Sequence, residues 1–282
     1  MKKLIFFSAV VLVLLGTVQP LIADDYTNRN PWEKFSFNAG AFLTATNTSL
    51  RFGSGLGVSV DLEEALDMST ENSVYRFGGY WRFTNNRRHR FGLSWFSLHR
   101  SARKTITDQI VIEPPGGGED IIVVPGTEVK SKFNLDIYQL NYSYSIIQDD
   151  RLDFAAQAGL YIMPISFSLS ASGLAKTEAD QSFTAPLPEI GLRFDLLIAP
   201  KWYLRTGSQV FYIEYEDYTG SLLDVQSAIE YNPWKHVGFG IGFDVFKLAL
   251  EANGNEAVPG MDLRGNVAFQ YVGAILYGRI FF

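Results

Sequence analysis

The strongest constraint on how this chain can fold is a long-range alternation of apolar and polar residues. Between Leu152 and Ile162 every even position is apolar, whereas Asp153, Gln157 and Tyr161 lie among the odd positions. Side chains of a β-strand point alternately to its two faces, so this segment predicts a long strand with one apolar face. A helical period is nowhere sustained, and only residues 62–68 suggest one or two helical turns within a loop.

The same alternation predicts about ten antiparallel strands. They cover residues 35–43, 75–83, 91–95 and onward, 138–146, 152–170, 190–198, 202–215, 223–231, 237–245 and 265–282. Beyond Pro164 the apolar positions change parity to Ile165, Phe167 and Leu169. A single change of parity at a proline predicts a β-bulge inside one strand.

The connections between these strands are of two alternating kinds. Tight turns are predicted at 85–88, 149–150, 199–201 and 232–235, and longer loops at 46–73, 102–131, 171–184, 216–220 and 252–262. Short turns at one end and long loops at the other are typical of outer-membrane barrels, with the turns in the periplasm. An extra hairpin within 46–73 would raise the count to twelve strands, and the range left open is eight to twelve.

Alternation alone does not say which face points inward, because a soluble lipocalin-like barrel has the same period. Four features favour an apolar face toward lipid: an export segment, the terminal Phe282, glycines on the polar faces, and tryptophans near the predicted turns (Trp32, Trp81, Trp202 and Trp234). Lipid satisfies no backbone hydrogen bond, so every strand edge must then be paired. We therefore predict an all-β, transmembrane, up-and-down barrel.

The N-terminal segment has the pattern of a secretory signal peptide. Lys2 and Lys3 precede an apolar run from residue 4 to 15, and Gly16 and Pro20 follow it. Twelve apolar residues are too few to span a bilayer as a helix. The prediction is a signal peptide over residues 1–23 and one barrel domain over 24–282, the alternative being an uncleaved anchor helix.

Composition removes several classes of function. The chain has 282 residues and no cysteine, which excludes disulfide frameworks, cysteine-based metal centres and cysteine nucleophiles. A net charge of −6 argues against nucleic-acid binding, which needs dense lysine and arginine. No cofactor and no metal site are predicted.

These features together resemble the small outer-membrane β-barrel proteins of Gram-negative bacteria, the broad OmpA/OmpW-like group. The resemblance rests on the signal peptide, the alternating strands, the tryptophans near turns and the ending GAILYGRIFF. It implies a place in the outer membrane, contact with outer-membrane lipid and lipopolysaccharide, and recognition of the last strand, ending in Phe282, by the barrel-assembly machinery. Gly278 departs from the pattern, which has an apolar residue there. The resemblance is architectural and implies no activity.

If the apolar faces meet lipid, the opposite faces bring twelve charged residues into the lumen. They are Arg76, Arg82, Arg90, Arg193, Arg205, Arg279, Asp153, Glu189, Asp195, Asp224, Glu230 and Asp244. Such groups should pair off, because an isolated ion in a low-dielectric wall costs several kcal/mol. Arginine suits this role through its bidentate fork. The set is either the selectivity lining of a narrow pore or a structural network that seals the barrel, and ten strands favour the second.

Signals for catalysis are few. His99 has Ser97 and Ser101 on its face of the strand, which resembles the His-x-Ser site of outer-membrane lipid A deacylases. However, Ala102 stands where that family has Asn, and the sequence offers no acid in register. We therefore expect no enzyme, and place a lipid-modifying activity third among the functions considered.

The first expectation is a structural or narrow-pore barrel, and the second is a surface protein that binds a partner through its outer loops. The second rests on residues 105–130, where two short apolar segments flank PPGGG and predict a projecting hairpin. Exposed Ile110, Ile112, Ile121 and Ile122 there would offer an extracellular partner an apolar contact within loop 102–131.

Overall fold

The computed structural model describes residues 31–52, 60–107, 109–112, 121–171, 178–215, 218–252 and 265–282. The predicted signal peptide, residues 1–23, lies outside these ranges. Within them, no helix has the length and the apolar content that a membrane span requires.

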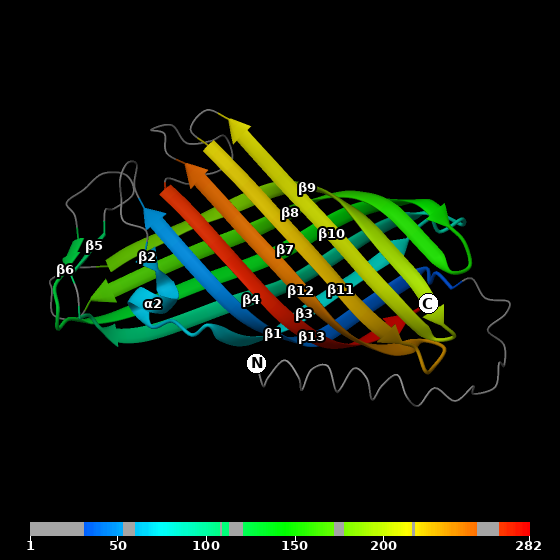
Figure 1. Ribbon diagram of the computed structural model, residues 1–282, viewed down its shortest axis with the longest axis horizontal. Helices are drawn as coiled ribbons and strands as arrows, with labels where there is room; N and C mark the ends of the chain where they lie inside the picture. The colour runs from blue at the N-terminus through cyan, green and yellow to red at the C-terminus, as the bar shows by residue number, and fades with distance from the viewer. Residues whose placement is uncertain are drawn as a thin grey trace, which may run out of the picture. The chain divides into compact units, whose positions relative to one another are not determined.

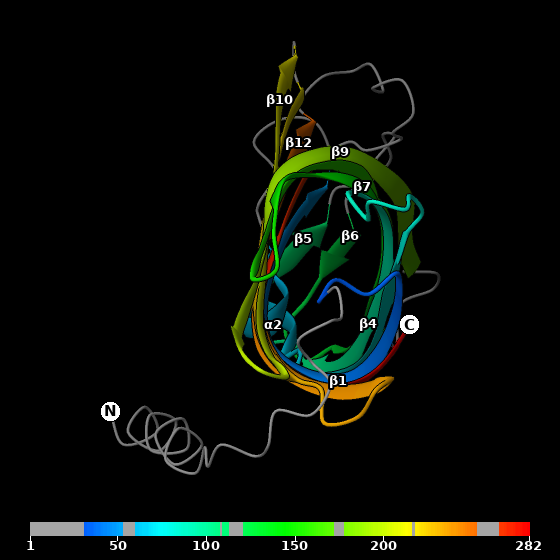
Figure 2. The same ribbon diagram turned by 90° about the vertical axis from the view of Figure 1, so that its right-hand side faces the viewer.

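Ten long strands form one closed antiparallel barrel (Figures 1 and 2). They are β1 (Phe35–Phe52), β3 (Glu71–Arg82), β4 (His89–Thr105), β7 (Glu128–Gln148), β8 (Leu152–Ala171), β9 (Glu178–Ala199), β10 (Trp202–Tyr215), β11 (Tyr218–Tyr231), β12 (Val237–Ala252) and β13 (Gly265–Phe281). Each strand pairs with the next, and β13 pairs with β1 from Ser36↔Phe281 to Phe52↔Gly265. This closure confirms the predicted up-and-down barrel.

Four short elements lie between the long strands. β2 (Val60–Asp61) pairs with β1 at Ser49 and Leu50, so the extra hairpin considered for 46–73 adds no strand to the ring. It leads into α2 (Leu62–Leu66), the expected helical turn, which packs against β1 and β4. β5 (Ile110–Ile112) and β6 (Ile121–Val123) pair only with each other, as the predicted hairpin requires, but over three residues each.

The outer face of the ring carries an apolar belt. Leu93, Leu140, Ile190, Ile241 and Leu276, on five different strands, are between 52 % and 66 % exposed. Large apolar side chains exposed all round a closed barrel are what a lipid environment requires. The predicted orientation, apolar face outward, is confirmed.

The tryptophan prediction is wrong for Trp32. Trp81 and Trp234 are exposed near the tight turns as expected, but Trp32 is buried and its indole N–H donates to the Asp149 carbonyl at 2.6 Å. Its ring lies edge-on to Tyr203. Trp32 therefore helps to fill the barrel end that carries the tight turns, hereafter the turn end; the opposite end is the loop end.

The β-bulge predicted at Pro164 is also absent. The β8–β9 register runs without a shift from Leu152↔Leu196 to Ser170↔Glu178, through Pro164↔Thr184. Ile165, Phe167 and Leu169 therefore stay on the face of Asp153 and point into the lumen, where they are buried. The apolar residues of β8 change from the outer to the inner face at Pro164, because inward-facing side chains become apolar toward the loop end.

Several strands extend farther toward the loop end than expected. β7 has 21 residues and β9 has 22, whereas about 9–11 residues cross a bilayer. Residues 178–184, predicted as loop, belong to β9. Pro186 and Pro188 follow this segment directly and resemble loop residues, yet the ladder from β9 to β8 is continuous through both.

Pairing between β9 and β10 stops at Ile190↔Val210, next to these prolines. Proline nitrogens cannot donate to a ladder, and in sheets proline is confined to strand edges. Because the ladder to β8 continues through both prolines, the missing donors belong to the edge that faces β10.

Candidate functional site

The structure places all twelve sequence-predicted charged residues on the inner face of the ring. Ten of them are buried, while the side chains of Arg90 and Arg205 keep 17 % and 11 % of their surface exposed. Three groups can be distinguished along the barrel axis: an ionic network at the turn end, a smaller polar cluster at mid-height, and an apolar cluster at the loop end.

One part of the ionic network joins β3, β8 and β9. Arg82, completely buried, has one guanidinium nitrogen 2.7 Å from Asp153 and another 3.6 Å from Asp195. Arg193 contacts the same two acids, at 3.1 Å from Asp153 and in direct contact with Asp195. Asp153 is therefore shared by two arginines, and Asp195 also lies 3.3 Å from Arg205 and 3.6 Å from Arg90. This sharing offsets the cost of burying the charges.

The other part is built around Glu33, which the lumen prediction did not include. Glu33 precedes β1 and accepts from Arg205 at 2.6 Å, and also from Arg279 and the hydroxyl of Tyr80. Burial opposes its charged form, but the two arginines and Tyr80 outweigh burial, so the pKa of Glu33 lies well below its usual value. Because Glu33 lies outside the alternating strands, only its position before the first strand could have pointed to it.

Glu230 completes this second part, because Arg205 and Arg279 both contact its carboxylate.

Arg90 is bound more loosely than the other arginines. Its nearest acid among the described residues is Asp195 at 3.6 Å, and its guanidinium lies 3.7 Å from the centre of the Tyr80 ring. Counting Glu33, five arginines meet four acids at the turn end.

At mid-height the expected one-to-one pairing of arginine with acid does not hold. Arg76 pairs with Asp244, which also accepts from Tyr271 at 3.2 Å. Asp224 instead accepts from the Tyr161 hydroxyl, and Glu189 accepts from the Gln139 amide at 3.0 and 3.2 Å. Among the described residues neither of these acids has an arginine within ion-pair distance. Tyrosine and glutamine replace the missing cations, a role that the alternation pattern cannot reveal.

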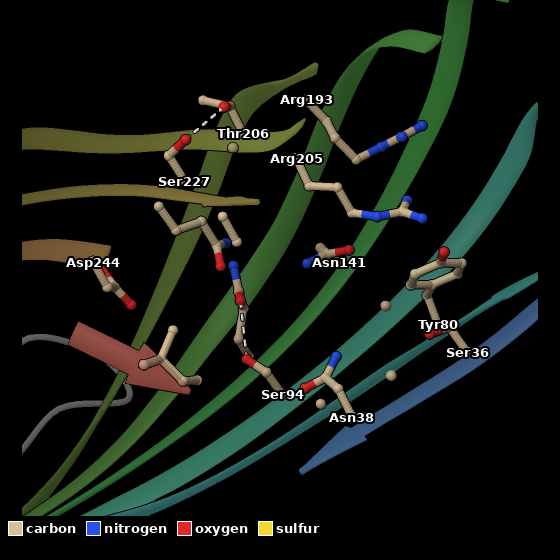
Figure 3. Close-up of a pocket in the computed structure, with 18 of the residues that line it drawn as sticks. Ser36, Asn38, Tyr80, Ser94, Asn141, Arg193, Arg205, Thr206, Ser227 and Asp244 are labelled. Atoms are coloured by element: carbon tan, nitrogen blue, oxygen red, sulfur yellow. Dashed lines mark hydrogen bonds between the residues drawn. The ribbon is translucent and has the colours of Figure 1, made fainter. Parts of the chain in front are cut away.

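A polar cavity of about 160 Å³ lies between the ionic network and the mid-height cluster. Figure 3 shows Arg193, Arg205 and Asp244 around it, together with Asn38 and Asn141. Small hydroxyl side chains complete the wall, with Ser94 bonded to Gln139 at 3.1 Å and Thr206 to Ser227 at 2.9 Å. A volume of this size holds a few water molecules.

The loop end of the lumen is filled by apolar side chains. This apolar cluster includes Phe133, Leu135, Met163, Phe246 and Leu250, each fully buried, and α2 contributes Leu62 and Leu66. α2 is held by Arg100 on β4, which pairs with Glu63 and donates to Thr46 on β1 at 3.0 Å. The alternation pattern does not reveal this cluster, because an inward apolar face above the membrane has the same alternation as a lipid-facing one.

His99 lies on the outer face of β4, close to an acid that the sequence pattern does not reveal. Its Nε2 is 3.6 Å from the Asp136 carboxylate on β7, where Ser97 and Asp136 are paired in register. Ser97 and Ser101 share the face of His99, but the structure records no hydrogen bond from either to its ring. No group of three or more potential metal ligands occurs in the described part of the chain.

At the turn end, Asp149 caps the β7–β8 turn. Its carboxylate accepts from the backbone N–H groups of Arg151 and Leu152, both at 2.8 Å. These two hydrogen bonds lower the pKa of Asp149, which is fully exposed. The tight turns predicted at this end are all observed.

No family model matches this sequence. No curated protein is significantly similar to it in sequence. Among solved structures, the outer-membrane protease OmpT of Escherichia coli is similar with a TM-score of 0.53 and 12 % identity, covering 90 % of this chain and 100 % of that chain. The toluene transporter TodX of Pseudomonas putida covers 88 % of this chain and 90 % of its own at 8 % identity and a TM-score of 0.37. Ail of Yersinia pestis covers 85 % and 97 % at 8 % identity and a TM-score of 0.30.

At these identities the likeness to OmpT shows the fold alone, which is that of an outer-membrane β-barrel. The apolar belt and the closed ring agree with the predicted localisation in the outer membrane of a Gram-negative bacterium.

Proposed function

We propose that this protein is a closed, structural barrel of the outer membrane whose lumen does not conduct, and that it is not an enzyme. The observation that carries the proposal is the apolar cluster at the loop end, because closely packed apolar side chains exclude water and ions. The ionic network at the turn end supports it from the other side. Between them lies the polar cavity of about 160 Å³.

Single-channel recording of the refolded barrel in a planar bilayer tests this proposal. We expect no conductance steps from protein that gel mobility shows to be folded. A double variant, Phe133→Ala with Phe246→Ala, removes two buried rings from the apolar cluster and should give small, frequent openings. Reproducible steps in the unmodified protein, altered by neutralising Arg193 or Arg205, would contradict the proposal and support a narrow, selective pore.

A second candidate function is surface interaction through loop 102–131. The paired hairpin β5–β6 favours it, because β4 and β7, which carry the hairpin, extend well beyond the apolar belt. Alanine replacement of Ile110, Ile112, Ile121 and Ile122 should then reduce binding of the barrel to a partner cell. Unchanged binding would remove this candidate.

A third candidate is a lipid-modifying enzyme, and the contact between His99 and Asp136 is the observation that favours it. An acid beside a histidine orients the ring for general-base work. A His99→Ala variant expressed in the native membrane tests it by mass spectrometry of lipid A. An unchanged lipid A spectrum would leave the closed barrel as the better description.

A further inference from the structure

Arg90 is the arginine of the ionic network whose side chain donates no hydrogen bond to any described residue. Its nearest acid there is Asp195 at 3.6 Å, and Arg82, Arg193 and Arg205 already contact that carboxylate. The Nε atom of Arg90 is buried and has no partner among these residues. A guanidinium withdrawn from water needs acceptors for its N–H groups. The geometry therefore favours an acceptor that does not belong to the chain.

Two further unpaired groups lie beside Arg90 in the register of the sheet. Arg90 on β4 lies opposite Ser143 on β7, and Ser143 lies opposite Gln157 on β8. The Ser143 hydroxyl and the Gln157 amide nitrogen are buried, and neither has a hydrogen-bond partner among the described residues. Neighbouring strands are about 4.8 Å apart, so the three residues span about 10 Å. Donors in such a row suit a ligand with several lone pairs.

This row borders the polar cavity, because Arg90 and Gln157 are both among the residues that line it. An inward glycine, Gly207, leaves part of the space open, and Tyr80 and Asn141 form other parts of the wall (Figure 3). The volume of about 160 Å³ is close to that of a cavity that holds benzene. The cavity can therefore hold an organic ion of about six non-hydrogen atoms.

The charged residues around the cavity leave one positive charge in excess. Among the described residues that line it are four arginines and three acids: Arg76, Arg90, Arg193, Arg205, Asp195, Glu230 and Asp244. Glu189 and Asp224 do not line it, and they accept hydrogen bonds from Gln139 and Tyr161. A bound anion with one negative charge balances this lining, whereas a second negative charge would be buried without compensation.

We propose that the polar cavity binds one small monocarboxylate of about six non-hydrogen atoms or fewer. The fork of Arg90 matches the two oxygens of a carboxylate, and the Gln157 amide supplies a further donor. Because the apolar cluster fills the loop end, the ligand enters from the turn end. Binding at this site goes beyond the proposed structural role and does not depend on whether the lumen conducts.

Equilibrium dialysis with radiolabelled acetate tests the proposal. The barrel is refolded in detergent in the presence of the label, so that slow entry does not hide the site, and we expect saturation at one acetate per barrel. Arg90→Gln should weaken binding about 10- to 100-fold, the loss expected for a hydrogen bond to a charged group. The control Arg151→Gln removes the same charge at an exposed turn and should bind acetate as the unmodified protein does. No saturable binding, or equal binding by the two variants, would overturn the proposal.

A second pair of variants changes the space in the cavity and leaves the charge unchanged. Gly207→Leu fills part of the cavity and should abolish acetate binding. A Cβ at this position lies 3.5 Å from the Gln209 and Gln226 side chains, which is an ordinary contact, so the fold should persist. Gly278→Leu adds the same side chain on the lipid-facing side of β13, where a Cβ meets no atom within 4 Å, and should bind acetate normally. Equal binding by the two variants would place the acetate outside the cavity and contradict the proposal. Gel mobility before and after heating confirms that each variant is folded.

Competition then defines the class of ligand. Formate and propionate should displace the labelled acetate, whereas octanoate should not, because its chain is too long for the cavity. Sulfate should compete poorly because of its second charge. Displacement by chloride as effective as that by formate would show a site for any small anion and would contradict the monocarboxylate assignment, as would displacement by octanoate.

Discussion

The two ends of the lumen are filled by side chains of opposite chemistry. At the turn end, Arg82 and Arg193 share Asp153 and Asp195 in a buried ionic network. At the loop end, the same ring of strands encloses Phe133, Leu135 and their apolar neighbours. The backbone is the same antiparallel barrel at both ends, so the difference lies only in which side chains point inward.

This difference shows two ways in which inward-facing side chains can fill a barrel lumen. The stability of an ionic network depends on geometry, because every buried charge must lie close to an opposite charge. The stability of an apolar cluster depends mainly on the volume of its side chains, and the cluster tolerates rearrangement as long as the space is filled. Substitutions at the two ends should therefore differ in size and in their dependence on pH.

The largest effect is expected at Arg82. Arg82→Met leaves part of the charge of Asp153 and Asp195 without compensation, and should lower the free energy of unfolding by about 3–5 kcal/mol. Urea unfolding followed by tryptophan fluorescence would measure this loss. The control is Arg151→Met at an exposed turn position, which should change stability by less than about 1 kcal/mol. Similar small losses for both variants would mean that the network does not hold the turn end.

A slightly smaller effect is expected in the apolar cluster. Leu135→Ala removes a fully buried side chain and should cost about 3 kcal/mol through lost burial and the cavity left behind. The same unfolding measurement at pH 8 and pH 5 should give equal losses, because no titrating group is involved. Leu140→Ala, on the lipid-facing side of the same strand, is the matched comparison and should cost less. A loss of stability that varied with pH would contradict the expected difference between the two ends of the lumen.

Glu33→Gln is expected to show the pH dependence that the apolar cluster lacks. The pKa of Glu33 is lowered in the folded barrel, so its stabilisation is present above its unfolded pKa of about 4.3 and is lost as pH falls through the folded value. At pH 7 the variant should lose about 2 kcal/mol, and the gap to the unmodified protein should shrink on acidification below about pH 4. A gap that stayed constant down to pH 2 would argue against the ionic role of Glu33. The exposed Glu64→Gln serves as the control.

The smallest effect is expected at Asp149, outside both ends of the lumen. Asp149→Ala removes the cap on two backbone N–H groups of the turn and should slightly increase their hydrogen exchange. Because the pKa of Asp149 is lowered in the folded state, its contribution is present at neutral pH and fades in acid. Asp150→Ala, one residue along the turn, should leave exchange unchanged. Equal exchange in both variants would show that the cap is dispensable.

The sequence was informative where a strand crosses the membrane and less so beyond it. Alternation identified ten strands and the inward position of residues such as Arg193, because lipid on one side and a polar lumen on the other give the two faces opposite character. It failed at Ile165 and Phe167, where an inward apolar face under a polar outer face imitates a bulge. It also missed Glu33 and Trp32, which enter the lumen from a segment without regular structure.

The contact between His99 and Asp136 was missed for a different reason. The two residues are 37 positions apart, and only the register of β4 against β7 brings them together. A register cannot be read from one sequence when the connecting loop is long.

The prolines of β9 affect how copies of the barrel can associate in a crowded membrane. Beyond Ile190 no described residue pairs with the strand on the side of β10, and a bare strand edge can pair with a strand of another molecule. Pro186 and Pro188 remove two donors from that edge, so a neighbouring barrel cannot extend the sheet across it. Densely packed copies of this protein should therefore stay separate rather than join edge to edge into arrays.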